Sequence, residues 1–122
     1  TGTPVDTTLT ASITPKFSTS KILVIVSQCF QVYGTQGAGW VVNLQRNGSN
    51  IQSEQMQLGS ASGASNYNNM YTTLNMTYLD SPATTSSTVY YFAVKNTGAG
   101  TNYVGQDGSG VCGTITLLEV AG

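Results

Sequence analysis

The run at positions 22–26 (ILVIV), five consecutive branched aliphatic residues, constrains the fold of this chain most. Four of the five are β-branched, and the preceding segment 14–20 (TPKFSTS) is rich in turn residues, which together favour a strand over a buried helix. Side chains of a strand alternate between its two faces, so a strand with one wet face carries polar residues at every second position. This strand is instead predicted to be apolar on both faces. One face can fill a core, and the other must be covered by a second layer or another copy of the protein.

The chain carries little charge: 7% of its 122 residues are charged, and it has no histidine. A neutral polar surface without a basic patch argues against nucleic-acid binding. No stretch is long and apolar enough for membrane insertion, and no signal peptide is recognisable at the start. The 39% hydrophobic content lies in discrete runs, which argues against disorder and is typical of rigid extracellular or virion β-proteins. We expect one domain, 1–122, and because it opens without methionine we expect it to be a piece of a longer polypeptide.

No segment has helical periodicity, and turn residues separate short apolar runs. The pattern predicts strands at 7–13, 21–33, 40–46, 51–58, 67–79, 89–94, 103–104 and 111–120. Asn47-Gly48 predicts a type I′ hairpin turn, which would bring Arg46 near Glu54. Phe17 is expected to pack where the chain turns into the second strand. Eight such strands fit an all-β, two-sheet antiparallel β-sandwich of jelly-roll type.

Strands 89–94 and 111–120 are, like 21–33, apolar at nearly every position. The most economical arrangement places all three in one sheet, whose outer face then packs against symmetry-related copies.

The two cysteines, Cys29 and Cys112, are too few for a disulfide scaffold or a zinc site. We expect two buried free thiols acting as small hydrophobes, and the alternative is a disulfide between neighbouring strands.

The chain lacks the residues of most catalytic centres. Without histidine no Ser-His-Asp or Cys-His arrangement can form, and the three lysines stand in no recognisable motif. The five carboxylates do not form an evident glycosidase pair: Asp80 and Asp107 sit beside turn residues, where carboxylates bond to local N–H groups, and Glu54 is expected to pair with Arg46. The stretch 105–110 (GQDGSG) lacks the ending of a phosphate loop, and it has too few carboxylates for calcium. We therefore expect no enzyme activity, no metal and no cofactor.

Four segments resemble, in the same order, the C-terminal domain of bacteriophage tail-fibre proteins. They are 14–27 (TPKFSTSKILVIVS), 44–51 (LQRNGSNI), 79–94 (LDSPATTSSTVYYFAV) and 113–122 (GTITLLEVAG), and they span most of the chain. The resemblance implies a trimeric sandwich, loosely similar to tumour-necrosis-factor and C1q heads, at the tip of a fibre that touches the host. Some fibre tips bind metal through histidines, and this chain has none.

Taken together, these observations predict a non-enzymatic structural protein of a phage virion, assembled in the host cytoplasm as a homotrimer at the tip of a tail fibre. The alternatives are a capsid decoration or head fibre without host recognition, and a secreted C1q-like module. The predicted trimer-interface residues are Ile22, Val24, Val26, Tyr90, Phe92, Ile115 and Leu117. Loop aromatics beside amides suit binding of a host surface glycan or protein, because sugars stack on aromatic faces and bond to amides. These receptor-binding candidates are Tyr33, Trp40, Asn66, Tyr67, Asn68, Asn102, Tyr103 and Asp107, although Trp40 and the tyrosines can equally be core residues.

Overall fold

The computed structural model describes residues 5–34, 38–57, 68–97, 100–104 and 113–122, with side chains described over 9–31, 38–56, 70–97 and 113–122. Within these residues the chain is all-β, and it contains no helix. The eight expected strands are present, with bounds β1 Val5–Ile13, β2 Lys21–Gly34, β3 Gly39–Arg46, β4 Ser49–Gln57, β5 Asn68–Asp80, β6 Thr88–Thr97, β7 Gly100–Val104 and β8 Gly113–Val120.

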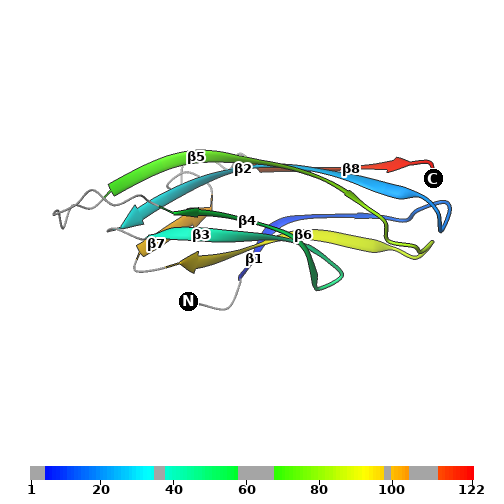
Figure 1. Ribbon diagram of the computed structural model, residues 1–122, viewed down its shortest axis with the longest axis horizontal. Coiled ribbons are helices and arrows are strands. Elements are labelled where there is room, and N and C mark those ends of the chain that lie inside the picture. The colour runs from blue at the N-terminus through cyan, green and yellow to red at the C-terminus, as the bar shows by residue number, and fades with distance from the viewer. Residues whose placement is uncertain (1–4, 35–37, 58–67, 98–99, 105–112) are drawn as a thin grey trace.

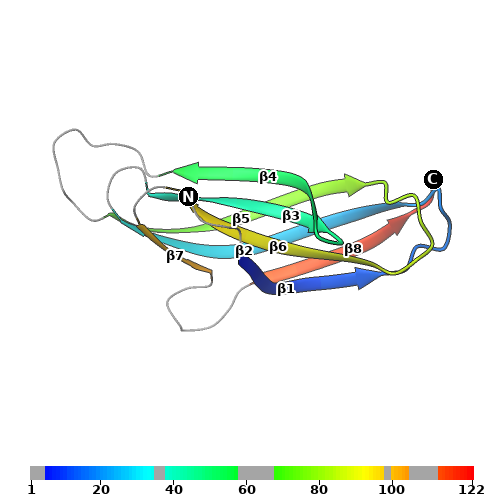
Figure 2. The same ribbon diagram turned by 90° about the horizontal axis from the view of Figure 1, so that it is seen from below.

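The strands form two antiparallel sheets, compatible with the expected β-sandwich (Figure 1). One sheet has the order β1-β6-β3-β4. In the other, β2 is the central strand: β5 pairs with it along one side, while β8 and β7 pair with successive parts of the other side. The run 22–26 therefore lies in the middle of a sheet, as its apolar character requires. Figure 2 shows β1 and β8 along one edge of the sandwich, where the two sheets contact each other.

The core lies between the sheets and is built from alternate residues of the strands. In β2 the even-numbered side chains Ile22, Val24, Val26 and Phe30 are buried there. The ring of Phe30 stacks on Trp40 of the opposite sheet, with 4.9 Å between centroids. The odd-numbered residues of β2 point to the other side, so a strand with no polar alternation still has one inward and one outward face.

The Asn47-Gly48 turn is confirmed. It joins β3 to β4, and both residues have the positive φ of a type I′ turn, 47° and 86°. The prediction that Arg46 lies near Glu54 is wrong, however. Arg46 pairs with Ser49 in the hairpin, while Glu54 lies opposite Val42, too far along the ladder to reach the guanidinium.

Two further expectations about packing are wrong. Strand 89–94 does not share a sheet with the other two apolar strands, because β6 pairs with β1 and β3 in the opposite sheet. An apolar run on both faces of a strand therefore does not require that the other apolar strands lie in the same sheet. Phe17 does not pack into the turn before β2, since 64% of its side chain is exposed.

Candidate functional site

The outer face of the β5-β2-β8 sheet carries the most conspicuous surface feature of the described residues. Leu23 of β2 lies between its cross-strand partners, Leu79 of β5 and Leu118 of β8. Ile25 and Val120 adjoin this row on the same face. Four of these five side chains are exposed and Leu23 is half-buried. We call the five residues the apolar patch.

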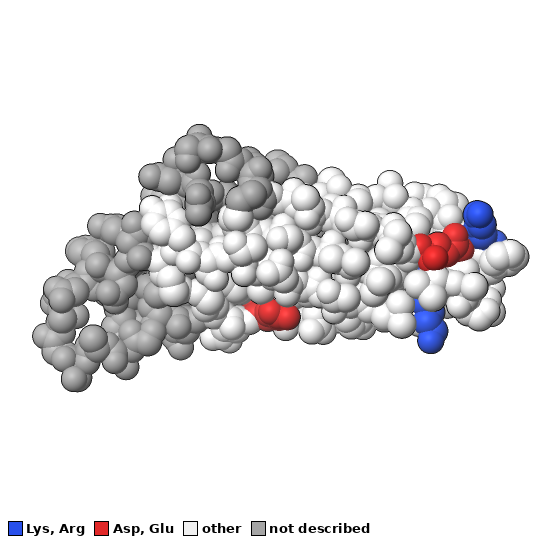
Figure 3. All heavy atoms as spheres, turned by 90° about the horizontal axis from the view of Figure 1, so that it is seen from above, with Lys and Arg blue, Asp and Glu red and all other residues white. Residues whose placement is uncertain are grey.

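Around the apolar patch the outer face is polar and almost uncharged. The described outward positions of β5 and β8 beyond the patch carry hydroxyl and amide side chains, namely Tyr71, Thr73, Asn75, Thr77, Thr114 and Thr116, of which Tyr71 also exposes an aromatic ring. Among the outward positions of these three strands whose side chains are described, Lys21 alone is charged, and it lies at the end of β2. Figure 3 views this face, with acidic and basic side chains at one end and one edge and none across the middle of the described surface.

The residues predicted for the trimer interface lie on the opposite side of the same strands. Ile22, Val24, Val26, Tyr90 and Phe92 are fully buried in the core of the single chain, and Ile115 and Leu117 pack against that core. The five fully buried side chains have no surface left for a second copy, and the half-buried Ile115 and Leu117 face the same core. The prediction is corrected: any contact between copies through this sheet falls to the alternate residues of β2, β5 and β8.

Five of the predicted receptor-binding residues belong to strands that begin or end at one end of the sandwich: Tyr33, Trp40, Asn68, Asn102 and Tyr103. Gly34 at the end of β2 pairs with Asn68 at the start of β5 and with Gly100 at the start of β7. In the other sheet, Gly39 pairs with Gln57 and Thr97. Six strand ends therefore meet here, and the C-terminus lies at the far end of the molecule (Figure 1). We call this the six-strand end.

Only one of the receptor-binding candidates has a described side chain. Trp40 is buried against Phe30 and is a core residue, so it is withdrawn as a recognition residue. Four others belong to strands whose backbone alone is described at those positions: Tyr33, Asn68, Asn102 and Tyr103. The remaining three, Asn66, Tyr67 and Asp107, lie outside the described residues.

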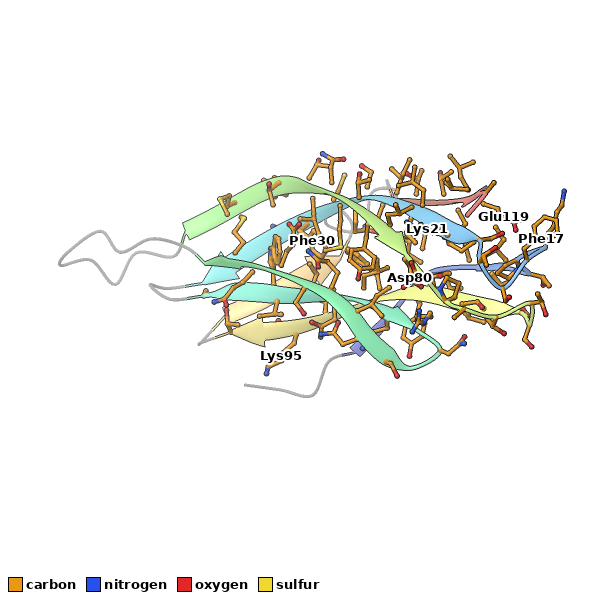
Figure 4. The ribbon with its side chains drawn as sticks, turned by 45° about the vertical axis from the view of Figure 1, so that its right-hand side comes forward. Phe17, Lys21, Phe30, Asp80, Lys95 and Glu119 are labelled. Carbon is orange, nitrogen blue, oxygen red and sulfur yellow. The ribbon has the colours of Figure 1, made fainter. Side chains whose placement is uncertain are left out.

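A buried polar cluster joins the two sheets. Arg46 Nη1 of β3 lies 2.9 Å from both carboxylate oxygens of Asp80 of β5, and the Tyr90 hydroxyl of β6 donates to Asp80 Oδ2 at 2.6 Å. Figure 4 shows Asp80 between the sheets. Burial raises the pKa of Tyr90 well above its usual value, and the hydrogen bond to Asp80 and the negative charge of Asp80 raise it further, whereas Arg46 opposes the shift.

This cluster replaces the expected local role of Asp80. The carboxylate was expected to bond to backbone N–H groups of its own turn, but it instead accepts from two side chains of the opposite sheet. All of its partners are donors, and a tyrosine whose pKa is raised stays protonated, so the cluster holds no base or nucleophile poised for reaction. It acts as an inter-sheet clamp.

A second charged contact ties the C-terminal strand to the segment before β2. Glu119 Oε1 accepts the backbone N–H of Lys16 at 2.6 Å. The pKa of Glu119 lies below its usual value because the nearby Ser20 hydroxyl and the Lys16 N–H favour the carboxylate. In Figure 4, Phe17, Lys21 and Glu119 lie near one another at this end of the molecule. Phe17 and Lys21 are exposed and Glu119 is half-buried, and the hydrogen bond from Lys16 to Glu119 joins the two segments.

Cys29 is not a free thiol. It is disulfide-bonded, and the described residues contain no free cysteine. The expectation of a buried free thiol is therefore wrong for Cys29; Cys112 lies outside the described residues.

Among the described residues, no three Cys, Asp or Glu side chains gather closely enough to hold a metal ion. In the same part of the chain there is no helix of the length and hydropathy needed to cross a membrane.

Comparison with known proteins identifies no relative: no protein-family model, curated protein sequence or solved structure matches this chain. The resemblance of four segments to phage fibre tips therefore remains a prediction from sequence.

Proposed function

We propose that this chain is a non-enzymatic structural domain of a phage virion, a jelly-roll-type sandwich that forms a homotrimer at the tip of a tail fibre. The proposal has two parts, self-assembly and recognition of a host surface glycan or protein. Assembly fixes the domain at the tip, and three copies then raise the avidity of weak single contacts.

The observation that carries the proposal is the apolar patch. An apolar cluster on an otherwise neutral polar surface marks a surface that another protein covers. The patch lies on hydrogen-bonded strands, at the start of β2 and the ends of β5 and β8, where the backbone holds it in one arrangement. A rigid preformed surface loses little conformational entropy on association, which suits a permanent assembly.

Recognition is proposed for the six-strand end. Tyr103 belongs to β7, which starts at this end, and Tyr67 directly precedes β5 in the sequence. Loops held by a rigid sheet commonly carry binding residues, because the scaffold positions them while their sequence varies. The end lies away from the apolar patch, which leaves it accessible in an assembled protein.

The alternative is a capsid decoration or head fibre, which requires the trimer but no host contact. The apolar patch supports both alternatives equally, whereas the aromatic and amide residues near the six-strand end favour recognition.

Three measurements test the proposal. Light scattering on the purified chain should give the mass of three copies at micromolar concentration, and a stable monomer would exclude the assembly part. Antibody labelling of whole virions should mark the fibre tips, and labelling of the capsid would favour the alternative. Tyr67→Ala and Tyr103→Ala should weaken binding to host cells, and unchanged binding in both would remove these residues from the recognition part.

A further inference from the structure

We infer that copies of this chain meet through the outer face of the β5-β2-β8 sheet, with the apolar patch at the centre of the contact and a second copy of the same face as its occupant. The inference rests on the proposed assembly, and it names the surface that makes the assembly.

Exposure singles out this face. Leu79 and Leu118 are 48% and 49% exposed although they flank Leu23 in one cross-strand row. Opposed side chains of neighbouring strands lie about 5 Å apart, so the row forms one continuous apolar strip across three strands. The outer face of the other sheet has no such strip: among its described side chains, Val89 is the exposed large aliphatic residue, and Ser12 and Tyr91 surround it.

Charge identifies the occupant as a second copy. When identical faces meet around a symmetry axis, any charged side chain near the axis meets its own like charge, which is destabilising. The described outward positions of this face carry no charge between Lys21 and Gln31 of β2, nor beside them on β5 and β8. Lys21, the cross-strand partner of Val120, is the one charge among these described positions, so the face can meet itself without repulsion when the two copies keep Lys21 away from the axis. A partner recognised through charge would find nothing to bind there.

A contact of this kind must use the whole described face and extend past it, because the flat area of the face is below that of a standard interface. With about 3.4 Å per residue and about 4.8 Å between strands, the described part of the three strands covers roughly 35 Å by 14 Å. A standard stable interface buries about 800 Å² of accessible surface per partner. The five apolar residues alone are too few for this, so the threonine rows beside them must also be covered. Hydroxyls of Thr77 and Thr116, which flank Ile25, are the nearest of these.

The apolar residues are distributed so that a cyclic assembly can use them. Leu79 lies on one side of β2, and Leu118 and Val120 lie on the other. In a three-fold ring the contact is heterologous, with the β5 side of one copy against the β8 side of the next. Leu79 on the β5 side of one copy can then contact Leu118 and Val120 on the β8 side of the next copy.

The experiment uses a matched pair of substitutions in the full chain. Val120→Asp places a carboxylate on the apolar patch, and Val89→Asp places one on the outer face of the other sheet. Both positions are valines on strands, with 40% and 38% exposure, so their effects on the folded monomer should be similar. Leu118→Asp tests the row of three leucines at its β8 side, and Leu118→Thr is a milder variant that keeps a good strand residue. Far-UV circular dichroism of each variant checks that the β-fold is retained.

Light scattering over a dilution series that starts in the micromolar range is the measurement, and the masses of the variants are compared at the same concentrations. We expect the wild type and Val89→Asp to keep the oligomer mass, Val120→Asp and Leu118→Asp to fall to the monomer mass, and Leu118→Thr to dissociate at a higher concentration than the wild type. If the wild type is an oligomer that both patch variants leave intact, this inference is refuted while the proposed assembly stands. A monomeric wild type refutes both. Dissociation of Val89→Asp alone would move the contact to the other sheet.

Discussion

The inter-sheet clamp allows a quantitative test, the substitution Tyr90→Phe. It removes one hydroxyl and leaves the ring in the core, so the change in free energy of unfolding reports the hydrogen bond to Asp80. That bond is 2.6 Å long and its acceptor is a carboxylate with about 5% exposure. Hydrogen bonds to charged groups contribute about 1.5–3 kcal/mol. Arg46 still contacts both oxygens of Asp80 after the substitution, so the carboxylate keeps a partner and we expect a loss of about 2 kcal/mol.

For a domain of this size such a loss lowers the melting temperature by roughly 6–12 °C. Thermal and urea unfolding followed by circular dichroism measure it, at one fixed protein concentration because self-association also contributes to stability. Tyr91→Phe is the matched control: it is the adjacent residue of β6 on the opposite face, and its loss should stay within about 0.5 kcal/mol. A double-mutant cycle with Asp80→Asn should give a coupling of at least about 1 kcal/mol. Equal, small effects of the two tyrosine substitutions would refute the clamp.

Three further predictions concern other parts of the chain. The pKa of Glu119 is lowered from 4.5 in the folded protein, so the stability that Glu119 contributes is present above pH 4.5 and is lost as the pH falls through the folded pKa. Thermal melts across this pH range should show a falling melting temperature, and Glu119→Gln should make the melting temperature less dependent on pH. Gly48 has a φ of 86°, so Gly48→Ala should cost about 1 kcal/mol from backbone strain even though the new Cβ has room beside Tyr91, and a urea titration that shows no change would contradict this. Reduction of the Cys29 disulfide should lower the free energy of unfolding by about 2–4 kcal/mol, measured by melts with and without reductant; identical melts would indicate that the bond does not stabilise the fold.

Much of the secondary structure could be predicted from the sequence. All eight strands are present, and most of their ends lie within two or three residues of the predicted positions. Apolar runs and turn residues act locally, so a single sequence contains this information. The Asn47-Gly48 turn was predictable for the same reason, since its positive φ values depend on two residues alone.

The candidate surface was predicted only in part. The sequence indicated that β2 is apolar on both faces, and it could not indicate which face turns inward, because a run without polar residues has no alternation to read. Whether Ile22 or Leu23 faces inward depends on how β2 pairs with β5 and β8, where Leu23 lies opposite Leu79 and Leu118. These residues are distant in the chain. Adjacent leucines at 117 and 118 were the available signal: two neighbouring strand residues must face opposite ways, so one of them had to lie on the outer face.

The sequence by itself determined the fold class, the strands and the presence of a second apolar face that needs cover, since these follow from local alternation, propensity and turn chemistry. Only the tertiary structure decided which strands share a sheet, which side chains form the apolar patch, and that Asp80 joins Arg46 and Tyr90 across the core. These features depend on pairings between residues that are far apart in the chain. Local patterns do not encode such pairings, because the same apolar run can pack with either face inward.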